Sequence, residues 1–399
     1  MKLKIITRSL FYPVAAILFL ASCEGPMGPA GLNGQDGQDG TDANETCKTC
    51  HNSVVVDAKS REYSYSVHAT GGAYTQGTRN ACAPCHSHQG FMDVVSRNVS
   101  ASFVTDPTDN SKFINSYVAS SSALSLPGSI NCFTCHSSLH TNYNSTEFLP
   151  LTSTAAVPMT MYGGTKSLDF AQESSNLCAK CHQPRPVTGA DGNVINYAAL
   201  VSNPDDPFTM ASVGYRTGIH YGPHAAMAAG IGGIELGTGY TNSAHTEGAS
   251  CTSCHMATPS GMAGGHSFTA TANFNGCNVS GCHSGMSASG SMLQTVTDDI
   301  SGLIDQLAEE INAIGNGNDI LQKDPEDGLY HGYLDIYDRS ANPDGYWKNP
   351  ALGNVALPQL TNAQFAAIIN FQLVVRDGSM GVHNYPYIKK LLENTLEAI

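Results

Sequence analysis

Six cysteine–histidine segments recur along the 399-residue chain, and they use twelve of its thirteen cysteines. Five have the form Cys-x-x-Cys-His and begin at Cys47, Cys82, Cys132, Cys178 and Cys251. The sixth begins at Cys277 and has four residues between its cysteines. Two thiols at such a spacing add across the vinyl groups of a porphyrin while the next histidine ligates the iron, which is the attachment pattern of haem c. The pattern predicts six covalently attached haem c groups.

The predicted thioether and iron ligands follow directly from these segments. The thioether cysteines are Cys47, Cys50, Cys82, Cys85, Cys132, Cys135, Cys178, Cys181, Cys251, Cys254, Cys277 and Cys282. The proximal histidines are His51, His86, His136, His182, His255 and His283. A Cys-x-x-Cys pair alone also suits half of a zinc site, a redox dithiol or a disulfide. Histidine is only 15 of 399 residues, so its presence after all six pairs favours haem. For the sixth segment, a free or disulfide-bonded pair is the alternative.

Nine further histidines are available for the other side of each iron: His68, His88, His140, His220, His224, His245, His266, His331 and His383. Six of them would make every haem bis-histidine, which leaves a surplus of three. His88 follows the proximal His86 by two residues, too close to reach the far face of the same iron. His140 follows His136 by four residues, and His68 lies fourteen residues before Cys82.

Local sequence around four of these histidines is similar to that of known multihaem cytochromes. Residues 379–384, Ser-Met-Gly-Val-His-Asn, resemble the C-terminal distal-ligand segment of the cytochrome c nitrite reductase and hydroxylamine oxidoreductase superfamily. The pairing of Cys-Thr-Ser-Cys-His-Met at 251–256 with Gly-Gly-His-Ser-Phe at 264–268 resembles a multihaem module. The segments that begin at Ser243 and at His220 resemble distal ligands of that module.

This resemblance extends patchily from Cys47 to Leu392 and implies a multihaem cytochrome lipoprotein. With the local contexts above, it implies the distal set His68, His140, His220, His245, His266 and His383. His224 and His331 stay as spare candidates. The sequence does not tell which distal histidine serves which haem.

The N-terminus has the features of an export signal and a lipid anchor. A positively charged start is followed by an apolar run from Leu10 to Leu20, which is too short for a transmembrane helix. Leu-Ala-Ser-Cys at 20–23 resembles a lipobox, so Cys23, the odd cysteine, is the predicted lipidation site; an ordinary signal peptide is the alternative. Glu24 after it, by resemblance to enterobacterial lipoproteins, implies the outer membrane, on its periplasmic or surface face. Thioether-fixed cysteines agree with an extracytoplasmic location.

The predicted organisation has four parts. Residues 1–22 are the lipoprotein signal peptide, and residues 23–46 are the anchor cysteine and a spacer with collagen-like glycine triplets, for which a flexible tether is favoured over a triple helix. Residues 47–290 form the hexahaem-binding region, rich in Gly, Ser, Thr and Asn. Residues 291–399 form a helical C-terminal region packed on the haem domain. The expected fold is mainly α with extensive irregular loops, little β and a haem-packed core.

Three helices are expected after residue 290. Apolar residues from Met292 to Ile314 recur with a 3.6-residue period, and Gly315 ends that helix. A second helix starts at Thr361 with a capping box to Gln364 and runs to Gly378. A third follows Asn384, with Pro386 in its first turn.

The net charge of the chain limits its partners. Residues 1–22 carry three positive and no negative side chains, so their removal moves the formal charge from −14 to −17. This acidity excludes nucleic acid and favours basic redox proteins or extracellular electron acceptors, besides the membrane that the lipid anchor would hold. Oligomerisation is left open.

Three functions are compatible with six haems. The first is an electron relay in extracytoplasmic respiration, because a bis-histidine haem has no open coordination position. The second is a reductase of nitrite, hydroxylamine or a sulfur oxyanion with one open haem, although the Cys-x-x-Cys-Lys segment typical of such a haem is absent from the sequence. The third is a polymerising subunit of a conductive filament. The histidine count favours the electron carrier over an enzyme.

Overall fold

The structure of the protein is a computed structural model. It describes residues 52–79, 82–96, 103–105, 107, 112–115, 126–136, 151–187, 194–209, 214–315, 319–336 and 357–399. Five predicted site residues, and with them the first haem segment, lie outside the described residues: Cys23, Cys47, Cys50, His51 and His140. The predicted signal peptide and spacer also lie outside them.

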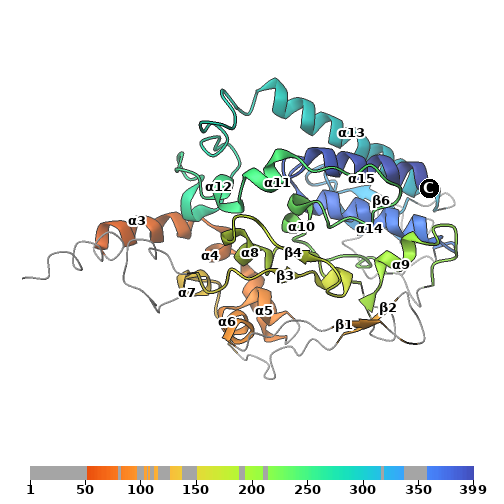
Figure 1. Cartoon of the computed structure of the whole chain (residues 1–399), viewed down its shortest axis with the longest axis horizontal. Helices are drawn as coiled ribbons and strands as arrows, with labels where there is room; N and C mark the ends of the chain where they lie inside the picture. The colour runs from red at the N-terminus through yellow and green to blue at the C-terminus, as the bar shows by residue number, and fades with distance from the viewer. Residues whose placement is uncertain are drawn as a thin grey trace, which may run out of the picture. The chain divides into compact units, whose positions relative to one another are not determined.

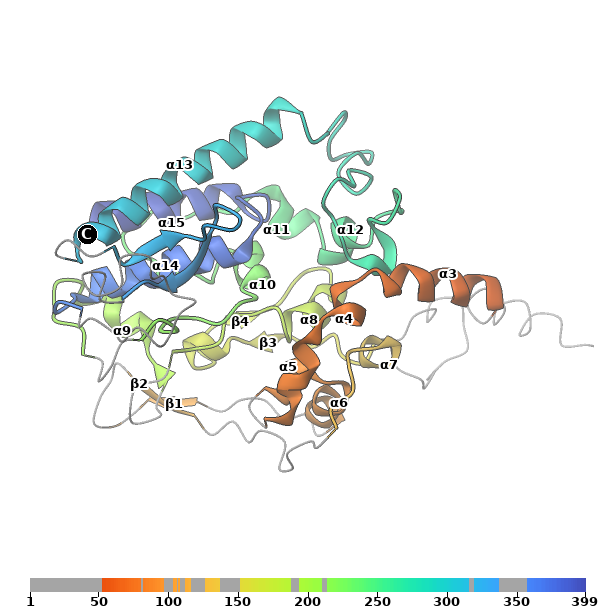
Figure 2. The ribbon, with the colours of Figure 1, turned by 180° about the vertical axis from the view of Figure 1, so that it is seen from behind.

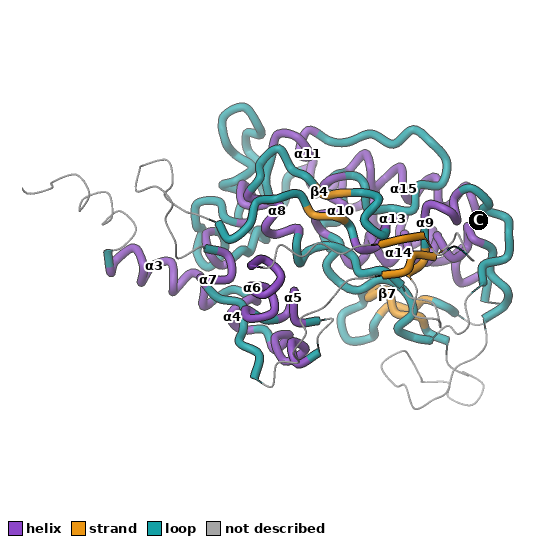
Figure 3. The backbone as a smooth tube through the Cα atoms, turned by 60° about the horizontal axis from the view of Figure 1, so that its bottom comes forward, coloured by secondary structure: helices purple, strands orange, loops and turns teal. Residues whose placement is uncertain are grey.

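The described chain is mainly helical, with long irregular loops and few strands, which confirms the predicted fold class (Figure 3). The α-helices are α3 (Ser53–Ser64), α4 (Val67–Thr70), α5 (Ala83–His86), α6 (His88–Ser96), α7 (Cys132–Cys135), α8 (Ser174–Ala179), α9 (Tyr197–Val201), α10 (His224–Ala229), α11 (Ala244–Gly248), α12 (Cys251–His255), α13 (Ser291–Ala313), α14 (Asn362–Asp377) and α15 (Tyr385–Ala398). The 3₁₀ helices are η1 (Gly72–Thr78), η2 (Thr160–Tyr162) and η3 (Gly265–Ser267).

The strands are short and form small antiparallel sheets. β1 (Phe103–Thr105), β2 (Lys112–Asn115) and β5 (Val194–Ile195) form a three-stranded sheet in that order, in which Val104 opposes Ile114. β3 (Val157–Pro158) pairs with β4 (Ser167–Leu168), and β6 (Leu321–Lys323) pairs with β7 (Tyr330–Leu334). Strands of two to five residues cannot build a core of their own.

The three predicted C-terminal helices are all present. α13 buries Ile300, Ile304, Leu307 and Ile311, which recur at the expected period. Thr361 and Gln364 form the predicted capping box at the start of α14, and Gly378 ends that helix with a φ of 66°, a backbone conformation that glycine adopts without strain. α15 begins after Asn384 with Pro386 in its first turn.

These three helices lie side by side along one side of the described part, and α14 is enclosed by its neighbours. Figures 1 and 2 show α5, α6 and α7 on the opposite side, with α8 and α10 between. α14 contacts α13, α15, α9, α10 and β7, and nearly all of its residues are buried. The largest apolar core of the described residues gathers around these helices.

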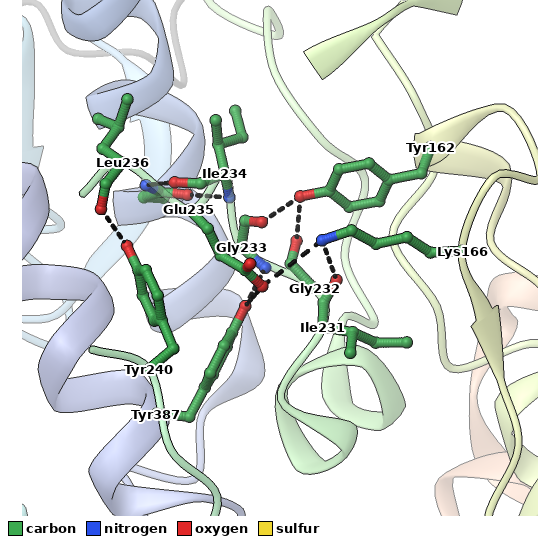
Figure 4. Close-up of polar contacts among 11 residues, drawn as sticks. Tyr162, Lys166, Ile231, Gly232, Gly233, Ile234, Glu235, Leu236, Tyr240 and Tyr387 are labelled. Atoms are coloured by element: carbon green, nitrogen blue, oxygen red, sulfur yellow. Dashed lines mark hydrogen bonds and ion pairs between the residues drawn. The ribbon is translucent and has the colours of Figure 1, made fainter. Parts of the chain in front are cut away.

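An extended segment, residues 231–236, is clamped between the C-terminal helices and the loop around β3 and β4 (Figure 4). Tyr387 of α15 accepts a hydrogen bond from the Gly233 amide at 2.9 Å, and Tyr162 donates to the Gly233 carbonyl. Buried Asn370 of α14 pairs with both the amide and the carbonyl of Ile234, at 2.8 and 2.9 Å. The clamp therefore joins the C-terminal helices to the cysteine–histidine part of the chain.

No helix among the described residues has both the length and the apolar character that crossing a membrane requires.

Replacement of Asn370 tests the clamp. Asn370→Ala removes the two bonds to Ile234 and a third to Thr395 (2.9 Å), and it leaves buried backbone groups without partners. We expect the free energy of unfolding to fall by about 3 kcal/mol. Urea unfolding of the full, haem-loaded protein, followed by circular dichroism, measures the change. Thr295→Ala, on the exposed face of α13, is the control; equal midpoints for the two variants would contradict the clamp.

Candidate haem centres

One turn of helix brings the reactive side chains of each Cys-x-x-Cys-His segment to one side. Residues i, i+3 and i+4 share a helix face, and these are the positions of the two cysteines and the histidine. In three segments the histidine amide donates to the carbonyl of the first cysteine, at 3.0 Å for His86, 2.8 Å for His136 and 2.9 Å for His182. The fifth segment forms α12, with Ser250 and Ser253 as a capping box.

The longer sixth segment closes in the same way. The His283 amide donates to the carbonyl of Cys277 at 3.1 Å, although two more residues intervene than in the other segments. Gly281 makes the extra turn at a φ of 88°, in open space. The sequence pattern alone did not show that the extra residues loop out and leave this closure intact.

The described cysteines are free and lie outside the one close group of possible metal ligands in this part of the chain. None of the ten cysteines that the structure describes forms a disulfide bond. Within the same residues, the side chains grouped closely enough to hold an ion are Asp324, Asp327 and His331, without any cysteine.

Each described proximal histidine faces one histidine of the predicted distal set. The distances between ring centres are 5.9 Å for His86 and His220, 6.2 Å for His136 and His266, 5.9 Å for His182 and His68, 6.2 Å for His255 and His383, and 5.9 Å for His283 and His245. The rings of three pairs are nearly perpendicular, at 71° to 79°, and those of two pairs are inclined by 40° and 41°.

This separation is what a shared metal ion requires. A metal–imidazole bond is about 2 Å long, and a ring centre lies about 1.1 Å from its nitrogen, so two imidazoles on opposite sides of one iron have centres about 6 Å apart. Edge-to-face contact between two rings spans the same range of centre-to-centre distances, so the separation fits an iron ion between the rings without requiring one.

In most of these rings the hydrogen bonds engage Nδ1, which leaves Nε2 available to bind iron. Nδ1 makes a hydrogen bond in six of the ten paired histidines, and its partners are of three kinds. Three are carbonyls: Tyr221 at 2.9 Å from His220, Val382 at 3.0 Å from His245 and Phe268 at 2.8 Å from His255. Two are carboxylates, Asp377 at 2.7 Å from His383 and Glu62 at 3.4 Å from His266, and the last is the His224 ring at 3.1 Å from His182. A ligating histidine normally engages its second nitrogen in this way. His136 differs, since no described residue accepts from its buried Nδ1.

Most of the paired histidines are biased toward the neutral form that binds metal. Burial and the nearby rings of His224 and His68 lower the pKa of His182 to about 3. Burial also lowers the pKa of His68, His86, His136, His220 and His266. His383 is the exception: burial opposes its charged form, but the charge and hydrogen bond of Asp377 raise its pKa overall.

The three surplus histidines have other partners. His88 Nδ1 lies 2.9 Å from the Thr134 hydroxyl and joins α6 to α7. His331 Nε2 is 2.9 Å from an Asp327 oxygen. His224 lies between two pairs: its Nδ1 is 3.1 Å from that of His182, and its ring centre is 5.0 Å from that of His182, closer than the His68 ring, and 6.2 Å from that of His383. No local sequence signal around His224 indicates this role.

Neighbouring centres touch through their attachment segments. The Cys85 sulfur lies 3.7 Å from the Lys180 carbonyl, so the second and fourth segments are in contact. The Cys251 amide donates to Ser175 at 3.1 Å, which joins the fifth segment to α8 of the fourth. The bond from His245 to Val382, next to His383, connects the sixth centre to the fifth.

Comparisons with known proteins add little. No protein-family model and no curated protein matches the chain. A solved structure, the outer cell wall cytochrome OcwA, is similar at 18% sequence identity and a TM-score of 0.41. The match covers 85% of this chain and 50% of that one, so this chain spans about half the length of the solved chain. The local resemblance to the nitrite reductase superfamily gains no support.

His383 and His224 provide a matched test of the ligand assignment. Both rings are partly buried, and the ring centre of His383 is 6.2 Å from those of His255 and His224 alike. If His383 binds iron and His224 only supports His182, His383→Ala opens one coordination position and gives one high-spin ferric haem. His224→Ala keeps every haem low-spin. Electron paramagnetic resonance of the ferric proteins measures both; a high-spin signal from His224→Ala would reverse the assignment.

Proposed function

We propose that the chain is a hexahaem c-type cytochrome that relays electrons along a series of bis-histidine haems. The observation that carries the proposal is the set of five opposed histidine pairs, each made of one Cys-x-x-Cys-His-type histidine and one distant histidine. The sixth pair would be His51 and His140, by elimination. When bound, a haem with two histidine ligands exchanges single electrons and has no position for a substrate.

The residues of this chain support the relay in three ways. The cysteines would fix each porphyrin covalently, so that its position does not drift between redox states. The opposed histidines would fill both axial positions, and their Nδ1 partners hold the rings in place. The contacts between the attachment segments at Cys85 and Lys180, and at Cys251 and Ser175, would keep neighbouring haems close enough to exchange electrons.

The same histidine arrangement speaks against a reductase. A reductase needs one haem whose distal side is open to substrate. Each of the five described proximal histidines has an opposing ring, so only the centre of His51, outside the described residues, leaves such a role open.

The cellular setting is also part of the proposal. The lipobox-like segment before Cys23 would anchor the protein to a membrane outside the cytoplasm, with the outer membrane favoured, and its partners would be basic redox proteins or extracellular electron acceptors. The acidity of the chain supports partners of positive charge.

Spectroscopy of the intact protein tests the relay. We expect six haems per chain by pyridine haemochrome assay, only low-spin ferric signals, and no rapid carbon monoxide binding after reduction, because both axial positions would be filled. Rapid carbon monoxide binding by the unmodified protein would favour the reductase. Cys23→Ser serves as the localisation control: it should leave the spectra unchanged and release the protein from the membrane fraction.

A further inference from the structure

The last turn of α14 carries two adjacent buried residues of opposite charge, Arg376 and Asp377, which are 7% and 3% exposed. They do not pair with each other. Asp377 bonds to His383, whereas Arg376 reaches the residues around His220. A buried charge is costly, so two of them beside two different histidine pairs call for an explanation.

Among the described histidine pairs, His383 has the closest carboxylate, that of Asp377. Its Oδ1 lies 2.7 Å from His383 Nδ1, its side chain is 1% exposed, and the Ser379 hydroxyl donates to its other oxygen. Glu62 also approaches a paired histidine, His266, but at 3.4 Å, and Lys59 neutralises it at 2.8 Å. At His220, His245 and His255 the Nδ1 partner is a neutral carbonyl.

Arg376 and Arg185 place positive charge at the pair of His86 and His220. Arg376 donates to the carbonyls of Ile219 and Gly332 and lies over the Tyr221 ring at 4.8 Å, and no described carboxylate forms an ion pair with it. Arg185 is exposed, with a guanidinium nitrogen 3.9 Å from the Cys82 sulfur of the same centre.

Charge at a haem changes its reduction equilibrium. Reduction adds one electron, so a nearby negative charge favours the ferric state and a nearby positive charge favours the ferrous state. A carboxylate on the second nitrogen of a ligating histidine also makes that ligand more basic and stabilises the ferric ion further.

We propose, on the basis of the electron relay above, that Asp377 gives the haem of His255 and His383 a low potential, while Arg376 and Arg185 give the haem of His86 and His220 a high one. The attachment segment of the His182 centre touches those of both other centres. The difference in potential would favour electron transfer from the His255 centre, by way of the His182 centre, to the His86 centre. None of the three charged residues touches iron; each acts through a ligand or through its field.

Two substitutions test the opposite signs. Asp377→Asn keeps the shape of the side chain and removes its charge; we expect reduction of one haem to become about tenfold more favourable, which is about 59 mV for a one-electron couple. Arg185→Gln, at an exposed site that does not endanger folding, should make reduction of a different haem about two- to threefold less favourable, because exposed charges are screened. Asp305→Asn is the control, since exposed Asp305 pairs with Lys323 and bonds no histidine.

A redox titration followed by electron paramagnetic resonance shows which class of haem shifts. The ring planes are inclined by 40° and 41° in the pairs of His136 and His255, and by 71° to 79° in the other three, so the ferric signals of the two classes differ in anisotropy. The proposal holds if the two variants move different signals in opposite directions. It is overturned if both stay within the shift of Asp305→Asn, or if one signal moves in both. If the potentials of both variants are unchanged and their spectra remain low-spin, only this proposal about the charges is contradicted. A high-spin spectrum of the unmodified protein would contradict the electron relay itself.

Discussion

The described structure depends on one constraint: imidazole rings face each other in pairs, with their centres 5.9 to 6.2 Å apart. Four of the five pairs join segments that are more than a hundred residues apart, such as His68 with His182 and His255 with His383. The N-terminal part has almost no apolar core of its own: between residues 52 and 136 the buried apolar side chains described are Ala83, Pro84 and Phe91. Side-chain burial alone would not offset the conformational entropy of ordering such a segment. Porphyrins held between the ring pairs would supply the missing apolar contacts, so folding and haem attachment are expected to be coupled.

Local signals sufficed where structure depends on neighbouring residues. The period of apolar residues located α13, and the capping box of Thr361 and Gln364 located the start of α14. The ligand types were equally local, since a single helical turn explains why Cys-x-x-Cys-His works as a unit. The proposed distal set came from short contexts, but its pairing required the tertiary structure, because nothing near His68 indicates that His182 faces it.

Other features could not be predicted from the sequence because they also depend on the tertiary structure. His224 differs from a distal ligand only in that its Nδ1 meets the Nδ1 of His182, a contact made across 42 residues. Asp377 stands six residues before His383, and only the turn after Gly378 brings the two side chains together. The three-stranded sheet of β1, β2 and β5 was also not expected, because its strands are too short to show a clear alternation.

Each of the five described histidine pairs would give its iron the same two ligands, so ligand identity cannot distinguish one centre from another. What differs is the partner of Nδ1 and the charge behind it: a carbonyl at His220, a carboxylate at His383, another histidine at His182. These partners lie on elements that the C-terminal helices hold, since α14 carries Arg376 and Asp377 and its Asn370 clamps the segment after α10. The helical region would therefore do more than cover the haem-binding part. By placing opposite buried charges at consecutive positions of one helix, it would make the potentials of two centres differ without changing the ligands of either.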